Sequence, residues 1–269
     1  MLTHRVRPAL VVLLTVAVGW SAVADHEAGS PSIPDPGFEL SAHARLFGDL
    51  GPLEAMLEYA GTYETDREAV THRLTAGGYY RVHRNLKAGA FYRLQVGARH
   101  DEDWIEVSMD DWRWRDTTQR FEHVAILDLT PRFLLDFLPG ENWVLAVKNR
   151  YELTAFRQDD PVLLHSLLVR PGLTWFLLRD REPLLNLSLQ YATYWSLSFG
   201  DVPWYRHGPY LNVLYHLAPG LSVDASLGMQ WVYWTESADY LMDWPTLPYF
   251  HGRVYRPWAI DVGVIYKVR

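Results

Sequence analysis

Apolar and polar residues alternate along most of the chain, and the segment 221–236 shows this pattern clearly. Leucine, valine, alanine, methionine and aromatic residues fill its odd positions up to 233, and serine, aspartate, glycine and glutamine fill its even positions up to 230. Successive side chains of a strand point to opposite faces, so the pattern predicts a strand with one apolar and one polar face. We expect ten such strands, near 53–65, 70–83, 86–99, 120–134, 142–156, 162–178, 184–199, 204–217, 220–236 and 254–268.

These strands predict an all-β chain that forms a transmembrane up-and-down antiparallel β-barrel. Their length of about 12–15 residues exceeds the usual length of about 5–6 residues in soluble sheets. A sheet crosses a membrane only when it is closed, because every backbone group then has a partner. A soluble β-sandwich or a lipocalin-like barrel, with the apolar face inside, is the alternative.

The connections predict an even number of strands. Tight turns are expected at 83–85, 139–142, 179–183 and 218–220, and they alternate with connections of variable length, of which 100–119 and 237–253 are long. An up-and-down meander with both chain termini in the periplasm has this alternation. Two further segments leave the count open between ten and twelve. Residues 38–50 alternate like a strand, although Ser41 is also suited to cap a short helix, and 104–115 is a possible additional crossing.

The first residues have the pattern of a secretory signal. Arg5 and Arg7 precede an apolar core at 9–18, and the small residues of 22–24 form a cleavage site, so we assign 1–24 as a signal peptide. Residues 25–50 are expected to be a periplasmic leader, possibly with a short helix or an extra strand, and 51–269 the barrel. The chain has no cysteine, which excludes disulfides and a lipidated N-terminal cysteine.

Aromatic residues on the apolar face predict two interfacial rings. Aromatics make up 14% of the chain, with 12 Trp and 16 Tyr, and such residues concentrate where a membrane meets water. One ring is expected near the tight turns and the other roughly ten residues away along the strands. The first comprises Tyr80, Trp143, Trp175, Tyr215 and Tyr266, and the second Tyr63, Tyr151, Trp195, Tyr233 and Trp258.

Charged residues gather on the opposite face, which would line the barrel interior. Small barrels have interiors that side chains largely fill, so we expect these charges to pair with one another, with a narrow conductance path as the alternative. The predicted lumen network comprises Glu54, Glu58, Arg73, Arg81, Arg93, Glu122, Asp128, Arg132, Arg150, Glu152, Arg170, Asp224 and Asp261, with Lys87, Lys148 and Lys267 on the same face. The mature chain is acidic overall, which gives no reason to expect a nucleic-acid partner.

No motif with a known catalytic mechanism occurs, so we predict no catalytic residue, no metal and no cofactor. His207 with Asp201 is the nearest approach to an acid–histidine couple, and Ser196 and Ser198 lack a recognisable histidine partner. The acidic segment 101–111 lacks the spacing of a calcium loop. His251 with Asp239 or Asp243 is a further candidate couple at the outer rim of the barrel. His72, His123 and His165 occupy strand positions on the outward, apolar face, near the expected boundary of the membrane.

The final strand resembles the sorting segment of bacterial outer-membrane β-barrels, with outward Ile260, Val262, Val264, Tyr266 and Val268. It departs from the family habit of a final aromatic residue. The resemblance covers 53–268 and assigns no subfamily; it implies a Gram-negative outer-membrane location, with membrane lipid and lipopolysaccharide as partners. In architecture alone, ten strands resemble the omptin proteases and twelve the outer-membrane phospholipases.

We expect a non-enzymatic integral membrane barrel, structural or porin-like with a narrow pore, because no catalytic motif occurs and the charges of the small lumen can pair with one another. Its outer loops 100–119 and 237–253 would be contact surfaces. The alternatives are a protease-like or phospholipase-like hydrolase at the outer rim, and the membrane component of an export or adhesion system. The sequence identifies no protein partner.

Overall fold

The computed structural model describes residues 37–65, 69–97, 104–108, 111–114, 121–138, 142–157, 161–198, 204–233, 254–255 and 258–268. The predicted signal peptide and residues 25–36 of the predicted leader lie outside these ranges. Within the ranges, no helix is long and apolar enough to cross a membrane.

Eleven strands of the described chain form one closed barrel. In chain order they are β1 (Phe38–Leu50), β2 (Leu53–Glu64), β3 (Ala69–His83), β4 (Leu86–Gly97), β7 (Phe121–Leu134), β8 (Trp143–Arg157), β9 (Pro161–Arg179), β10 (Glu182–Ser196), β11 (Trp204–Ala218), β12 (Leu221–Met229) and β15 (Trp258–Val268). Two short pieces extend the wall: β13 (Trp231–Tyr233) pairs with β11, and β14 (Val254–Tyr255) pairs with β13.

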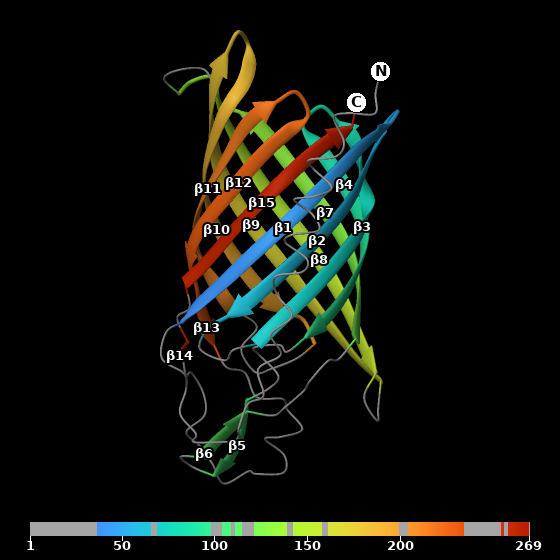
Figure 1. Ribbon diagram of the computed structural model, residues 1–269, viewed down its shortest axis with the longest axis vertical. Coiled ribbons are helices and arrows are strands. Elements are labelled where there is room, and N and C mark those ends of the chain that lie inside the picture. The colour runs from blue at the N-terminus through green and yellow to red at the C-terminus, as the bar shows by residue number, and fades with distance from the viewer. Residues whose placement is uncertain are drawn as a thin grey trace.

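The barrel closes through a parallel pair of strands. Consecutive barrel strands run antiparallel, whereas β1 and β15 run in the same direction, with Phe38 opposite Trp258 and Gly48 opposite Val268. Figure 1 shows this seam as the blue β1 lying beside the red β15. An odd number of alternating strands requires such a pair, because the first and last strands then point the same way.

The predicted strand count of ten was therefore wrong, and so was the alternative of twelve. Residues 38–50, which the sequence left open as a strand or a helix, form β1 and supply the eleventh strand. The segment around 104–115 does not cross, because β5 (Trp104–Ser108) and β6 (Asp111–Trp114) pair with each other in a separate two-stranded sheet. As a result, the first barrel strand begins at the rim opposite to the one where the last strand ends.

The two rims of the barrel differ in their connections. At the upper end in Figure 1, which we call the tight-turn rim, the hairpins turn at 51–52, 84–85, 180–181 and 219–220. Asp180 and Arg181 have φ of 52° and 68°, the left-handed pair that suits a two-residue hairpin. The strand ends that the other connections join lie at the opposite end, which we call the long-loop rim. Four of the five connections at the tight-turn rim are two-residue turns, and the fifth, between β7 and β8, covers 135–142. The connections at the other rim vary in length, with 158–160 short and 98–120 long, so the predicted alternation is present except at β7–β8.

The barrel wall is apolar outside and largely polar inside. Along β7, buried Glu122, Asp128 and Thr130 alternate with exposed leucine and phenylalanine residues. Among the described residues, 16 buried side chains are polar or charged and only 7 are hydrophobic, the reverse of a water-soluble core. A small apolar cluster also lies inside, formed by Met56, Phe91, Val124 and Ile126, with Phe47 and Tyr79 against it.

Candidate functional site

Asp128 is the centre of one ionic cluster in the lumen. Its side chain is almost fully buried, and it accepts hydrogen bonds from Arg150 Nε at 2.7 Å and Arg150 Nη2 at 3.0 Å. The ammonium of Lys148 lies 3.4 Å away, and the Tyr79 hydroxyl donates at 3.3 Å. Two cations and a phenol thus surround one carboxylate, as a buried charge requires.

A second carboxylate extends this cluster around the wall. Arg93 donates to both oxygens of Glu152 at 2.8 and 3.2 Å, a bidentate arrangement that fixes the guanidinium plane. Arg150 lies 3.6 Å from the same Glu152, so the two clusters are continuous. On the other side of the barrel, Arg45 and Glu58 face each other across β1 and β2, and Arg45 Nε donates at 2.6 Å.

Each rim has its own ionic group. Near the tight-turn rim, Glu54 accepts from Lys87 at 2.5 Å and from Lys267 at 2.9 Å, and Lys267 also pairs with Asp49 at 3.0 Å. Near the long-loop rim, Glu39 accepts from Arg206 at 3.1 Å and from the amide of Gln230 at 3.0 Å. Charges are therefore paired at several depths along the lumen.

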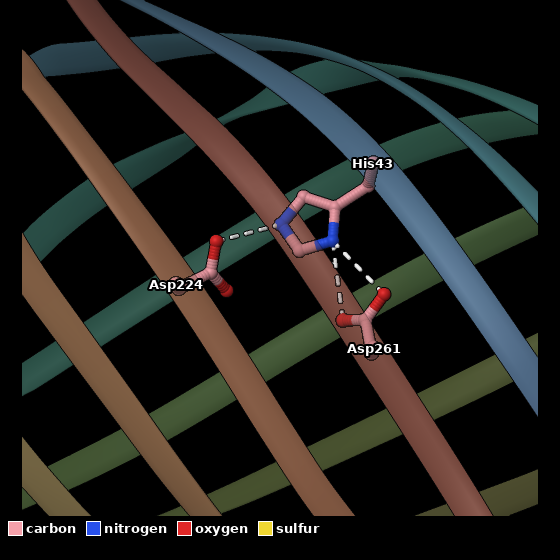
Figure 2. Close-up of side chains that lie close together, drawn as sticks. All are labelled: His43, Asp224 and Asp261. Carbon is pink, nitrogen blue, oxygen red and sulfur yellow. Dashed lines mark hydrogen bonds and ion pairs between the residues drawn. The ribbon is translucent and has the colours of Figure 1, made fainter. Parts of the chain in front are cut away.

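A histidine clamp crosses the parallel seam. We use this name for His43 on β1, Asp261 on β15 and Asp224 on β12, which Figure 2 shows with the imidazole between the two carboxylates. His43 Nδ1 lies 3.1 Å and 3.2 Å from the two Asp261 oxygens, and Nε2 lies 3.1 Å from Asp224 Oδ1. The clamp therefore links three neighbouring strands, including both strands of the seam.

Gly263 makes the clamp possible. In register, His43 lies opposite Gly263, and Gly263 lies opposite Asp224. The imidazole covers the glycine, and a Cβ atom there would overlap with the ring. Only a residue without a side chain lets the ring lie flat on β15 and reach the strand beyond it.

The chemistry of the clamp is that of a cation held between two anions. A carboxylate only accepts hydrogen bonds, so His43 donates from Nδ1 to Asp261, and as the imidazolium its Nε2 lies at ion-pair distance from Asp224. The three side chains also lie close enough to be considered as metal ligands. However, the two carboxylates face different nitrogens of one ring, and a single ion cannot bind both nitrogens. The arrangement is therefore suited to structural ion pairing.

Most residues of the predicted lumen network lie inside the barrel and have partners there. Arg73 donates to Thr62 at 2.8 Å, Arg170 donates to the Tyr194 hydroxyl at 3.3 Å, and Glu122 accepts from Gln95 at 3.2 Å. The pairs of Glu54, Glu58, Arg93, Asp128, Arg150, Glu152, Asp224 and Asp261 are those described above. By contrast, the side chains of Arg81 and Arg132 are exposed near the tight-turn rim.

Sequence reasoning missed five charged members of these clusters: Glu39, His43, Arg45, Asp49 and Arg206. The first four lie on β1, whose alternation of apolar and polar residues was visible but was not assigned to the barrel. Arg206 is the third residue of β11, and so few strand residues precede it that their alternation does not show which face of the sheet it occupies.

The predicted aromatic residues lie on the outer face where their side chains are described. Tyr80, Trp195, Tyr215, Trp258 and Tyr266 are exposed. Trp143 and Trp175 are direct register partners with ring centroids 6.5 Å apart. Tyr63 is half-buried, and the side chain of Tyr233 lies outside the described set.

The candidate rim chemistry is only partly described. His207 Nδ1 is 2.6 Å from the Tyr191 hydroxyl, and its ring stacks on Trp231 with centroids 5.1 Å apart. Ser198 Oγ accepts from the backbone N–H of His165, and Ser196 is buried. Asp201, Asp239, Asp243, His251 and the side chains of 101–111 lie outside the described set.

Comparisons with known proteins do not assign the chain to a family. A scan against family models, a search of curated proteins and a search of solved structures each find no match.

Proposed function

We propose that the protein is a non-enzymatic integral β-barrel of a bacterial outer membrane, with a lumen narrowed by self-paired ionic side chains. The observation that carries this proposal is the inverted wall. Large apolar side chains, among them Leu127, Leu163 and Leu189, are more than half exposed on the outer face, while acidic and basic residues lie inside. Exposed apolar patches of more than a few hundred Å² mark an interaction surface, and a band around a whole barrel fits lipid.

Lipid is a better partner for this surface than a protein. The exposed apolar residues occur on β1, β2, β3, β7, β9, β10, β11, β12 and β15, so they surround the barrel instead of forming one patch. The exposed aromatics near the two rims fit the two boundaries between hydrocarbon and water. Membrane lipid and lipopolysaccharide are accordingly the proposed partners.

The lumen favours a structural or narrow-pore role. A barrel of about eight strands is filled by its own side chains, and aqueous channels need about sixteen. The eleven-stranded barrel is nearer to the first case, and its interior contains paired charges as well as the cluster of Met56, Phe91, Val124 and Ile126. Charges that bind each other are not available to bind a solute.

The orientation follows from the connections. Outer-membrane barrels have short periplasmic turns and longer outer loops, so we place the tight-turn rim in the periplasm together with the end of β15. Because β1 begins at the opposite rim, the two ends of the barrel sequence would lie on opposite sides of the membrane, in contrast to the expectation that both termini are periplasmic. The regions 100–119 and 237–253 would then face outward as contact surfaces.

Membrane fractionation and gel migration test the proposal. The full chain should enter the outer-membrane fraction of a Gram-negative host, need detergent for extraction, and migrate differently on gels before and after boiling. In planar bilayers it should give small conductance steps or none. A monomer that stays soluble in buffer without detergent would overturn the membrane assignment, and stable openings of nanosiemens size would overturn the narrow lumen.

A further inference from the structure

The outer face carries a hydrogen-bonded tyrosine–histidine pair on each of four hairpins. The pairs are Tyr59–His72 at 2.9 Å, Tyr92–His123 at 2.6 Å, Tyr151–His165 at 2.5 Å and Tyr191–His207 at 2.6 Å, each between the hydroxyl and Nδ1. They lie on β2–β3, β4–β7, β8–β9 and β10–β11. Four repeats of one contact around a barrel indicate a common environment.

The geometry of the four pairs is the same. In each, the register partner of the histidine is the residue two positions after the tyrosine, for example Gly61 for His72 and Leu94 for His123. Each histidine is the third to fifth residue of a strand that starts at the long-loop rim. The pairs therefore form a belt at one depth near the long-loop rim, with exposed apolar residues such as Phe121 and Leu163 closer to the rim.

Three of these histidines are accessible, and one is not. His123 is exposed, His72 and His165 are half-buried, but His207 is only 8% exposed and stacks on Trp231. The phenol is a stronger acid than a neutral imidazole, so it donates to Nδ1. The ring then has its proton on Nε2. Each accessible pair consequently presents one N–H donor on the outer face.

The two rims share exposed aromatic residues but differ in these pairs. The tight-turn rim has the contacting Trp143 and Trp175 and exposed Tyr80, and the long-loop rim has exposed Trp195 and Trp258, but the four tyrosine–histidine pairs all lie at the long-loop rim. The acceptors found between hydrocarbon and water are mainly lipid phosphates and ester carbonyls, and a phosphate is the stronger acceptor of an N–H because it is charged. The asymmetry fits a leaflet rich in phosphate at the long-loop rim.

We propose that His72, His123 and His165, each oriented by its tyrosine, bind the phosphate groups of lipid headgroups in the leaflet at the long-loop rim. This inference rests on the proposed membrane function, because it needs the apolar band to lie in lipid. The tyrosine acts as a positioning residue that fixes the ring and its tautomer, and the Nε2–H donates to a phosphate oxygen.

Lipid retention by the folded full-length protein tests the inference. Native mass spectrometry in detergent would compare phosphatidic acid with diacylglycerol, which differ by the phosphate. The wild type should retain phosphatidic acid preferentially. The variant H72F/H123F/H165F keeps three aromatic rings and should bind phosphatidic acid at least about tenfold more weakly, as expected for a lost hydrogen bond to a charged group. H207F is the matched control and should bind as the wild type does.

The possible outcomes separate the two proposals. A barrel that enters bilayers but retains both lipids equally, or whose triple variant binds like the wild type, overturns the belt alone. A chain that does not enter bilayers overturns the belt together with the membrane function. If the triple variant does not fold, as judged by its gel migration, the single variant H123F replaces it and should lose one bound phosphatidic acid per barrel.

Discussion

His43 reaches Asp224 across an intervening strand, with its Nε2 atom 3.1 Å from the carboxylate, because Gly263 between them has no side chain. The contact matters because β1 and β15 form the parallel pair that closes the barrel. A parallel ladder is slightly less stable per residue than an antiparallel one. The clamp adds side-chain contacts at the place where the wall is formed by the two ends of the barrel sequence.

Replacing Gly263 with alanine should destabilise the barrel. The new methyl group would overlap with the His43 ring and displace it from its carboxylates. Overpacking of this kind costs about 1–3 kcal/mol. Urea unfolding in lipid vesicles would measure the loss. Gly48→Ala on β1 is the control, since a Cβ there meets nothing within 4 Å, and an equal loss in both variants would exclude displacement of His43 as the cause.

Replacing His43 with leucine should leave two carboxylates on neighbouring strands without their shared cation. Removing one partner of a buried ion pair costs about 3–5 kcal/mol, and we expect the lower end because the Asp261 side chain is 36% exposed. Combining His43→Leu with Asp224→Asn and Asp261→Asn should recover part of this loss. The same unfolding assay decides, and a triple variant no more stable than the single one would contradict the electrostatic explanation.

Replacing Arg181 with glycine should stabilise the hairpin between β9 and β10. Arg181 has φ of 68°, which is unfavourable for a residue with a Cβ atom, and the gain should be up to about 1 kcal/mol. Arg84 in the β3–β4 turn is not among the described residues with positive φ. Arg84→Gly should therefore give no gain, since it only adds freedom to the unfolded chain. Comparable stabilisation by both variants would show that backbone strain is not the cause.

The sequence predicted most strands well because they are long and alternate over most of their length, but β12 ends at Met229, before the expected end at 236. The bounds of β2, β3 and β4 differ from the expected ones by two residues at most. The same alternation of side chains also assigned the charged residues of these strands to the face that lines the barrel interior. These features depend on local periodicity, which a single chain shows directly.

The sequence could not determine how the barrel closes. The β1 segment has an incomplete alternation with small residues such as Ala42 and Ala44, and only its pairing with β15 shows that it belongs to the wall. The assumption of an even number of strands then excluded this segment from the barrel. The histidine clamp was missed for the same reason, because His43 and Asp261 are 218 residues apart and are neighbours only after closure.

Glu54 holds two lysines near the tight-turn rim, so Glu54→Gln should destabilise the barrel in a salt-dependent manner. Lys87 and Lys267 would keep their mutual repulsion with only Asp49 as a paired acid among the contacts described. These groups are about a quarter exposed or more, so we expect a loss of about 1–2 kcal/mol at low salt. At 1 M salt the screening length falls to about 3 Å, and most of the loss should disappear.

Urea unfolding at low salt and at 1 M salt measures this loss, with Glu182→Gln as the control because Glu182 is exposed. A loss that is the same at both concentrations would mean that Glu54 acts through packing instead of through its charge.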